Sequence, residues 1–371
     1  MEIDGGKMAE ALPEYDSLLF VSFGGPEAPE EVMPFLENVV RGKPVPRERL
    51  LEVAEHYYDF GGKSPINEQN REIIAKLTEE LKAHGIHLPI YWGNRNWKPY
   101  LHEALDEMKR DGKKRALAFF TSMFSCYSGC RQYRENIICA QEQVGDDAPI
   151  VEKVRMGFNH PRFITAATAQ VAEALELLSP DKRERAELVF TAHSIPLGMS
   201  KNAAYELQLN EACRLITKEL GRDDYTLCFQ SRSGPPSQPW LEPDVLDVLR
   251  DLAAQERDVV VLMPIGFVTD HMEVMQDLDV ECTEEAEELG MTFLRANTVG
   301  THPDFISMIR ELIVERISGT EERLALGELG AWHDVCPIDC CKYDMPQRPK
   351  PSEGGSREEN SDRPTSSGGR A

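Results

Sequence analysis

Short apolar runs of strand length alternate with amphipathic stretches along most of this chain, and this alternation constrains its fold more than any other feature. The apolar runs occupy residues 17–23, 88–92, 116–120, 150–154, 188–191, 225–229 and 259–262. Between them, apolar side chains recur with helical periodicity over residues 67–84, 162–178 and 305–317. Strands that alternate with helices pair in parallel and are covered by helices on both faces, so the pattern predicts an α/β fold built on parallel sheets.

The strand-and-helix repeats divide the 371 residues into two halves of ordinary domain size. We expect a first lobe over residues 15–150 and a second over residues 151–319, preceded by a flexible segment over residues 1–14. A cysteine-rich segment follows over residues 320–345. Residues 346–371 are rich in Pro, Ser, Gly and charge, which predicts disorder. No Gly-x-Gly-x-x-Gly motif follows the first strand, so NAD binding is not expected.

The composition, 41% hydrophobic and 28% charged, is that of an ordinary soluble protein. No apolar run approaches the roughly 20 residues of a membrane span, and the amino terminus lacks the basic and apolar parts of a signal peptide. We therefore expect a cytoplasmic protein without stable membrane insertion. The net charge of −23 argues against a nucleic-acid partner, because phosphate binding needs a basic face. It favours a protein that attracts cations.

Two polar segments directly follow predicted strands: residues 191–196, which contain His193, and residues 270–273, which end at Glu273. Ligands bind at the carboxyl ends of the strands in an open α/β sheet, so both side chains are expected to face one cleft. A neutral imidazole and a carboxylate can hold a divalent cation without trapping it, as an enzyme that passes a metal ion onward requires. On a helix His271 would point away from Glu273, so we expect it to have a structural or supporting role.

Carboxylates recur at three- and four-residue spacing in the region of Glu273: Asp270, Glu273, Asp277, Glu281, Glu284 and Glu288. On a helix they would project from one face, over about 22 Å from the first glutamate to the last. Such a run is commonly a solvated acidic face. The alternative is a track in which Asp277 and Glu281 lead a metal ion to Glu273. Like charges at this spacing repel, so a cation or an irregular π-type winding would relieve the strain.

Nine cysteines in a cytoplasmic chain are expected to be free thiols rather than disulfides. Cys336, Cys340 and Cys341 crowd into six residues near the carboxyl end, which suggests ligation of a soft metal. An iron–sulfur cluster usually takes four ligands, so a fourth must come from elsewhere, with Cys126 and Cys130 as candidates. The other thiols are expected to be buried as small apolar side chains: Cys139, Cys213, Cys228 and Cys282.

Seven motifs occur in an order that resembles the ferrochelatase family, and in particular the coproporphyrin-type ferrochelatases of actinobacteria. They are SFGGP (22–26), FGGKSPIN (60–67), GNRNW (93–97), YSGCRQYRE (127–135), TAHSIP (191–196), QSRSGP (230–235) and GFVTDHME (266–273). The similarity runs from about residue 16 to residue 319, more than 80% of the chain. Each motif alone is modest evidence, and the seven in this order are highly specific.

The resemblance implies two similar Rossmann-like, chelatase-type lobes with a porphyrin cleft between them. It implies an enzyme of haem biosynthesis, a lyase that inserts Fe²⁺ into a porphyrin and releases two protons. His193 and Glu273 would be the metal-binding and proton-accepting pair. A cleft can hold the macrocycle in a puckered form, and a positioned base can remove the pyrrole protons. Asn96 stands where some relatives have His, which puts a second catalytic histidine in doubt.

Further porphyrin contacts follow from the same resemblance. Phe23 would lie over a face of the macrocycle as an apolar contact, because Phe cannot ligate iron as a Tyr does there in some relatives. Ser64 and Tyr133 would contact the porphyrin or its propionates. His56 and Tyr57 match a basic and aromatic pair in which His replaces Arg, and this replacement weakens a propionate contact.

Some ferrochelatases carry a [2Fe–2S] cluster on three carboxyl-terminal cysteines and one internal cysteine. The resemblance therefore implies a [2Fe–2S] cofactor on Cys130, Cys336, Cys340 and Cys341. Cys126 would be a packed neighbour rather than a ligand.

The sequence identifies the porphyrin substrate less precisely than it identifies the reaction. Coproporphyrin III has four propionates, whereas protoporphyrin IX has two propionates and two vinyl groups. The chain has no membrane segment and no apolar terminal lip, which favours coproporphyrin III, with possible contact to neighbouring enzymes of the haem pathway. The alternatives are a protoporphyrin IX ferrochelatase, a cobaltochelatase acting on a corrin precursor, and a non-enzymatic iron–sulfur or haem sensor. The motifs around Ser64 and Tyr133 disfavour the cobaltochelatase, and the His193–Glu273 pair disfavours a sensor, which needs no base.

Overall fold

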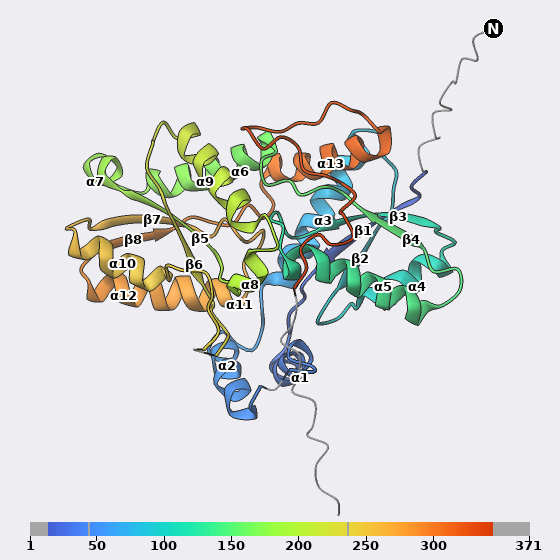
Figure 1. Ribbon diagram of the computed structural model, residues 1–371, viewed down its shortest axis with the longest axis horizontal. Helices are drawn as coiled ribbons and strands as arrows, with labels where there is room; N and C mark the ends of the chain where they lie inside the picture. Colours follow the sequence, from blue (N-terminus) through green and yellow to red (C-terminus); the bar gives the residue numbers. More distant parts are fainter. Residues whose placement is uncertain (1–13, 44, 236, 344–371) are drawn as a thin grey trace, which may run out of the picture.

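The computed structural model of the chain describes residues 14–43, 45–235 and 237–343. Within these ranges, eight strands form two separate four-stranded sheets, and every strand pair is parallel. Figure 1 shows the two sheets beside each other, each with helices packed around it. The two-lobed α/β fold predicted from the sequence is thereby confirmed. The predicted tail at residues 346–371 and residues 1–13 of the predicted flexible start lie outside the described residues.

The first sheet has the order β2-β1-β3-β4, with β1 at Ser17–Ser22, β2 at Ile90–Asn94, β3 at Arg115–Phe120 and β4 at Ile150–Lys153. β1 is buried along its whole length, as expected for a central strand covered on both faces. The segments that connect these strands contain α1 (Pro29–Val39), α2 (Arg47–Asp59), α3 (Ile66–Ala83), α4 (Leu101–Arg110), the π-helix η1 (Tyr127–Arg131) and α5 (Gln132–Val144).

The second sheet repeats this topology as β6-β5-β7-β8, with β5 at Glu187–His193, β6 at Thr226–Gln230, β7 at Val259–Met263 and β8 at Thr292–Arg295. Its helices are α6 (Pro161–Glu176), α7 (Pro180–Arg185), α8 (Leu197–Ser200), α9 (Tyr205–Glu219), α10 (Val245–Ala254), α11 (Met272–Val274), the π-helix η2 (Met275–Glu281), α12 (Cys282–Glu288) and α13 (Pro303–Ser318). In the described part of the chain, none of the helices is both long and apolar enough to cross a membrane.

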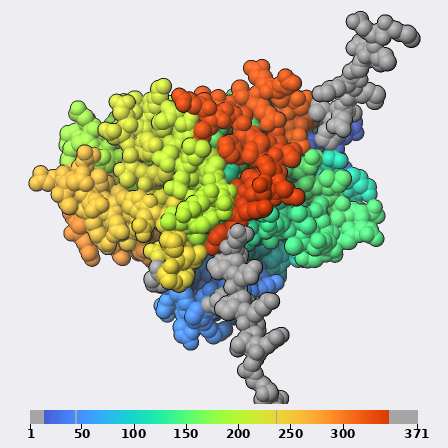
Figure 2. All heavy atoms as spheres, in the orientation of Figure 1, coloured from blue at the N-terminus to red at the C-terminus, as the bar shows by residue number. Residues whose placement is uncertain are grey.

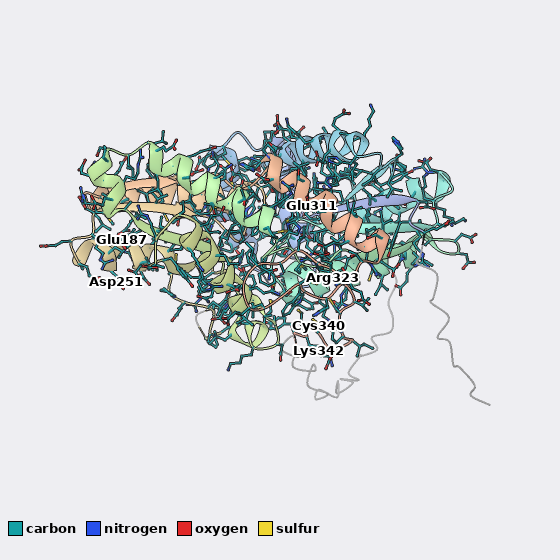
Figure 3. The ribbon with its side chains drawn as sticks, turned by 90° about the horizontal axis from the view of Figure 1, so that it is seen from above. Glu187, Asp251, Glu311, Arg323, Cys340 and Lys342 are labelled. Atoms are coloured by element: carbon teal, nitrogen blue, oxygen red, sulfur yellow. The ribbon has the colours of Figure 1, made fainter. Side chains whose placement is uncertain are left out.

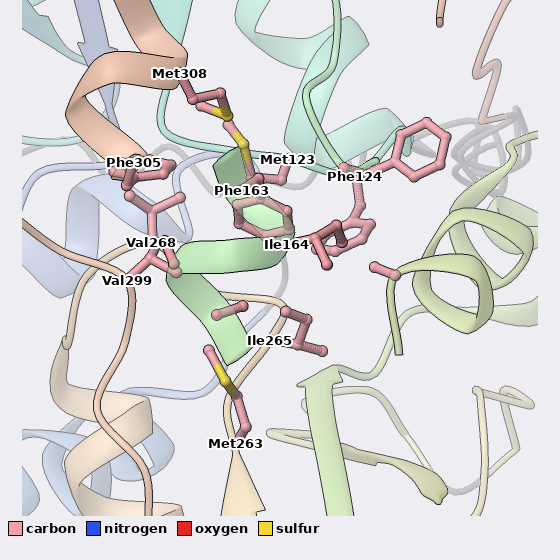
Figure 4. Packing of buried hydrophobic residues seen from close by; sticks show 14 of the residues in the cluster. Met123, Phe124, Phe163, Ile164, Met263, Ile265, Val268, Val299, Phe305 and Met308 are labelled. Carbon is pink, nitrogen blue, oxygen red and sulfur yellow. The ribbon is translucent and has the colours of Figure 1, made fainter. Parts of the chain in front are cut away.

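A continuous apolar core joins the two sheets through α6 and α13 (Figure 4). Phe163 of α6 and Phe305 of α13 have ring centroids 6.3 Å apart, and Phe305 is also 6.3 Å from Phe119 of β3. Met263 and Ile265, at the end of β7, belong to the same buried cluster. Side chains from both sheets therefore bury one another here. Each sheet also has a second, separate apolar cluster of its own.

After α13 the chain runs back over the molecule without forming a helix or strand up to residue 343. Figure 2 shows this segment lying across the front of the molecule, between the two halves. Its backbone is tied down at several points: the Leu326 N–H donates to the Asn159 carbonyl at 2.9 Å, and the Asn159 amide donates to the Gly330 carbonyl at 2.8 Å. Near the end, Gln238 donates to the Tyr343 hydroxyl at 2.9 Å. The segment is thus part of the folded body.

Candidate functional site

His193 is the last residue of β5 and lies beside Gln230, the last residue of β6. Its Nδ1–H donates to the carbonyl oxygen of Ser194, and its own carbonyl accepts a hydrogen bond from Tyr205 at 3.1 Å. These contacts fix the ring and direct Nε2 outward from the sheet edge. Nε2 lies 3.7 Å from Oε2 of Glu273, so the structure brings together the two side chains that the sequence placed at neighbouring strand ends.

The approach of Glu273 depends on a close backbone contact after β7. A Cβ on Gly266 would lie 2.6 Å from the Ala192 Cβ and 2.7 Å from its Cα, and only glycine fits this space. The Gly266 N–H donates to the Thr191 carbonyl at 3.0 Å, which holds the loop against β5. The loop then leads into α11, and Glu273 is the second residue of that short helix.

Glu273 and His193 shift each other's protonation. The Glu273 side chain is 52% exposed, so the loss of water around it is only partial and raises its pKa less than full burial would. The positive charge of His193 and the contact with its ring outweigh this effect and lower the pKa to about 2. Burial alone would lower the pKa of His193, and the charge of Glu273 outweighs that effect, so its pKa lies above the usual value. The ion pair therefore favours a proton on His193 when no cation is bound, whereas the sequence suggested a neutral imidazole.

His271 lies close to the same carboxylate oxygen as His193. Its Nδ1 is 3.9 Å from Oε2 of Glu273, and its ring packs edge-on to Phe267 with centroids 4.7 Å apart. Burial lowers the pKa of His271. A packed imidazole at this distance fits the supporting role expected for it, next to the Glu273 carboxylate.

Asp277 is anchored by the last residue of β6 and by the residue after it. Its Oδ2 accepts hydrogen bonds from the Ser231 hydroxyl and, at 3.3 Å, from the Gln230 amide. Ser231 has a φ of +60°, a left-handed conformation that is unusual for a residue other than glycine. Burial, together with the charges of Glu273 and Glu281, raises the pKa of Asp277 to about 7. A half-buried carboxylate with like charges beside it favours a cation nearby.

The acidic run differs in character along its length. The π-helix η2 spans Met275–Glu281, so the irregular winding suggested by the like-charge spacing is present. Asp277 and Glu281 are half-buried, whereas Glu284 and Glu288 on α12 are exposed. Asp270 forms an ion pair with Arg295 at 3.3 Å, so its carboxylate is not available to a cation in the way that Asp277 and Glu281 are. The distal members thus form a solvated face.

The residues expected to contact a porphyrin gather around an aromatic group near Glu273. Phe23 follows β1 and is partly exposed; its ring lies 6.4 Å from that of Phe35. Tyr57, at the end of α2, packs 6.0 Å from the same ring, and the charge of Glu273 adds to burial in raising the Tyr57 pKa. Met272, next to Glu273, packs into this group as well.

The remaining expected contacts have more sheltered positions. His56 is half-buried, one residue before Tyr57. Ser64 is buried, and its N–H donates to the Pro26 carbonyl at 2.9 Å, below the loop that carries Phe23. Tyr133 is buried on α5 with its ring 5.3 Å from that of Phe120.

The structure also identifies residues to which the sequence gave no role. The Arg95 guanidinium lies 5.7 Å from the Phe23 ring centroid and 5.9 Å from that of Tyr133. Among the described residues it has no carboxylate within 4.0 Å, and burial lowers its pKa. Its position in the GNRNW motif, directly after β2, was a usable clue, since it is another polar residue at a strand end. Gln230 and Ser231 follow β6 in the same way.

The carboxyl-terminal thiols lie against η1 and α5 of the first lobe. The Cys340 and Cys341 sulfurs are 3.5 Å apart, and the Cys130 thiol is hydrogen-bonded to Cys336, which lowers the Cys336 pKa. Arg131 donates to the carbonyl of Cys340 at 3.1 Å and so holds the segment in place. Figure 3 shows Cys340 near Lys342 and Arg323, far from Glu187 and Asp251 at the outer end of the second lobe.

These four thiols fit the donor set of an iron–sulfur cluster, because they form two close pairs, one for each iron of a [2Fe–2S] unit. Cys126 is engaged differently: its sulfur accepts a hydrogen bond from the Gly129 N–H at 3.1 Å and caps η1. Of the scattered thiols expected to be buried, three are, and Cys139 is exposed, which corrects that prediction; the three are Cys213, Cys228 and Cys282.

Comparison with known proteins agrees with this geometry. A relative from Rhodopirellula baltica named ferrochelatase is 61% identical over 93% of this chain and 97% of its own length. A relative from Nocardia farcinica named coproporphyrin III ferrochelatase is 49% identical over 92% of this chain and 99% of its own.

Among solved structures, the sirohydrochlorin chelatase SirB from Bacillus subtilis, in complex with cobalt, has a TM-score of 0.51 at 11% identity, covering 84% of this chain and 99% of that one. This likeness concerns the fold and supports a chelatase-type arrangement of the two lobes. The family model for ferrochelatase matches residues 15–317. This chain is therefore a member of the ferrochelatase family.

Proposed function

We propose that the protein inserts Fe²⁺ into coproporphyrin III, giving the iron porphyrin and two protons. The observation that carries this proposal is the His193–Glu273 pair, 3.7 Å apart at the sheet edge and next to the aromatic group of Phe23 and Tyr57. The first lobe supplies most of the porphyrin contacts and the second lobe the metal-binding pair. Metal and macrocycle thus meet where the two lobes face each other.

The protonation of the pair suggests how the two protons move. Arriving Fe²⁺ displaces the proton on His193, and the imidazole and the Glu273 carboxylate become its ligands. When the ion passes into the macrocycle, His193 is free again. Its raised pKa makes it a good acceptor for one pyrrole proton, and the second leaves to solvent. Asp277 and Glu281 would form the approach to this pair, because a shielded carboxylate among like charges is relieved by a cation.

The choice of coproporphyrin III is supported by Arg95. A guanidinium that has no carboxylate partner among the described residues, and that lies near the rings of Phe23 and Tyr133, suits a propionate of the substrate. The four propionates of coproporphyrin III offer more such contacts than the two of protoporphyrin IX. Several relatives bear the name coproporphyrin III ferrochelatase, which points the same way.

The decisive test is anaerobic insertion of Fe²⁺ into coproporphyrin III and protoporphyrin IX, measured side by side, with Co²⁺ and a corrin precursor as a third arm. We expect the highest kcat/KM with coproporphyrin III. The His193→Ala variant should lose insertion and still bind the porphyrin, whose contacts are spread over many residues. Near-normal turnover in His193→Ala would overturn the assignment of this residue, and preference for another substrate would overturn the substrate.

We also propose that the Cys130, Cys336, Cys340 and Cys341 thiolates hold a [2Fe–2S] cluster. When bound, such a cluster supplies one-electron redox chemistry and a link between distant parts of the chain. Support comes from the two close sulfur pairs and from the burial of Cys130 against the carboxyl-terminal segment.

Protein purified without oxygen should show visible thiolate-to-iron absorption and about two irons and two sulfides per chain, as a [2Fe–2S] unit requires. Cys130→Ser should bleach it, whereas Cys126→Ser and Cys282→Ser, the matched controls, should not. A colourless, iron-free preparation would refute the cluster. Bleaching by Cys126→Ser alone would show that the internal ligand is Cys126.

A further inference from the structure

One imidazole belongs to the cysteine segment but is absent from the predicted ligand set. His333 is half-buried, and its Nε2 lies 4.0 Å from the Cys340 sulfur. The donor atoms of His333, Cys336 and Cys340 all lie within 4.8 Å of one another. Cys130 and Cys341 do not belong to this triplet. The segment and Cys130 together therefore offer five donors, one more than a [2Fe–2S] cluster uses.

The triplet is close to the dimensions of a tetrahedral metal site. With Zn–S near 2.3 Å and Zn–N near 2.0 Å, neighbouring donors in such a site are roughly 3.5–3.8 Å apart. The observed spacing is about 1 Å wider than this, and contacts of neighbouring residues hold the backbone around the three donors. The Trp332 ring packs 6.0 Å from Phe158, Arg323 pairs with Asp334 at 2.7 Å, and Arg131 donates to the Cys340 carbonyl.

The chemistry of the three donors narrows the choice of ion. One imidazole and two thiolates are the ligands that Zn²⁺ prefers, and they disfavour Mg²⁺ and Ca²⁺, which bind oxygen. Three protein ligands leave a fourth position open to water or to an incoming group.

We propose that His333, Cys336 and Cys340 form a mononuclear site for Zn²⁺ or a similar thiophilic divalent cation, with an open fourth position. The site shares Cys336 and Cys340 with the proposed cluster, so the two occupants exclude each other. The cation site needs His333 and not Cys341, whereas the cluster needs Cys341 and not His333. The site does not depend on the chelatase activity of the protein.

The test uses Co²⁺ as a spectroscopic probe for Zn²⁺, added to the full chain after removal of iron under anaerobic, reducing conditions. A His193→Ala background removes the other metal-binding pair. We expect one equivalent of Co²⁺ to bind with the intense visible bands of tetrahedral coordination and with thiolate charge-transfer absorption. Added Zn²⁺ should displace it. A spectrum without thiolate charge transfer would overturn the proposal.

The variants separate the two occupants. His333→Ala should weaken Co²⁺ binding at least tenfold, while the exposed control His87→Ala leaves it unchanged. Cys341→Ser should keep the Co²⁺ spectrum and lose the cluster absorption. His333→Ala should lose the Co²⁺ spectrum and keep the cluster absorption. His333→Gln, with circular dichroism of each variant, covers the case in which His333→Ala fails to fold. Equal Co²⁺ affinity and an unchanged spectrum in a folded His333 variant would overturn the site, whatever the outcome for the cluster or for iron insertion.

Discussion

The Glu273 carboxylate lies 3.7 Å from the His193 ring and 3.9 Å from the His271 ring, and replacing it with an amide of the same shape tests what its charge does. Glu273→Gln should lower kcat for iron insertion about a hundredfold or more, because the amide neither carries charge nor accepts a proton. It should also lower the pKa of His193, since burial then acts on the imidazole without the opposing charge. Steady-state kinetics measure the loss of kcat, and the pH dependence of kcat/KM in the two proteins reports the change in the His193 pKa. Glu284→Gln, at an exposed position, is the control; turnover within twofold of wild type in Glu273→Gln would contradict the prediction.

At the same scale, sequence patterns located some of the candidate functional residues and could not locate others. His193 and Glu273 were found because each follows a predicted strand, and the carboxyl ends of parallel strands share one edge of a sheet. The contact between Ser231 and Asp277 was not foreseen, since it requires a left-handed backbone at a serine, which no propensity predicts. His333 carries no periodic pattern, and its place beside Cys340 follows only from the folded path of an irregular segment.

At the scale of elements, the π-helix η2 turns Asp277 and Glu281 toward partly buried positions. Asp277→Asn and Glu281→Gln should each raise the Fe²⁺ concentration needed for half-maximal rate by several-fold and change kcat less, because they act on approach and not on transfer. Initial rates over a range of Fe²⁺ concentrations, at saturating porphyrin, measure this. The exposed Glu288→Gln is the control. An unchanged metal dependence would mean that these carboxylates are only a solvated face.

The loop between β7 and α11 gives a second test at this scale. In Gly266→Ala the new Cβ would meet the backbone of Ala192, so the loop must move and carry Glu273 away from His193. We expect a loss of stability of about 1–3 kcal/mol, typical of overpacking, and a lower kcat. Urea unfolding and kinetics report the two losses. Gly198→Ala, where a Cβ would meet open space, should change neither; full activity in Gly266→Ala would show that the close contact does not position Glu273.

The elements themselves were largely predictable. All seven strands expected from apolar runs are present, because each central run is long enough to be buried on both faces. β8 was missed: its four residues are only half-buried at the sheet edge, so Thr292–Arg295 lack the continuous apolar pattern of a central strand. The strand order within each sheet could not be predicted from the sequence either, since it depends on how the connecting helices cross.

At the scale of the whole molecule, His160, which is buried in the core between the lobes, makes the stability of the fold depend on pH. It is fully buried, its Nδ1 accepts the Arg162 N–H at 3.3 Å to cap α6, and its Nε2 faces Glu311 of α13. Burial, and then the charges of Arg155 and Arg162, lower its pKa to about 3. The unfolded chain binds a proton below about pH 6.5 and the folded chain does not. The stability that His160 contributes is thus present above pH 6.5 and falls toward pH 3, by up to about 1.4 kcal/mol per pH unit.

His160→Asn separates this effect from other titrations, because asparagine can still cap the helix but cannot take a proton. Between pH 7 and pH 5 the wild type should lose about 2 kcal/mol more unfolding free energy than His160→Asn. Urea denaturation at the two pH values gives the difference. Parallel pH dependence in the two proteins would show that His160 does not titrate across this range.

The carboxyl-terminal segment touches groups from widely separated parts of the sequence: Arg131 and Tyr127 of the first lobe, and Gln238 of the second. The ribosome makes the chain from its amino end, so the first sheet has all its strands long before this segment emerges. Cys130 is therefore synthesised and buried well before the carboxyl-terminal cysteines that lie near it. If the proposed metal binding at these cysteines occurs, it can begin only after Cys341 has been synthesised.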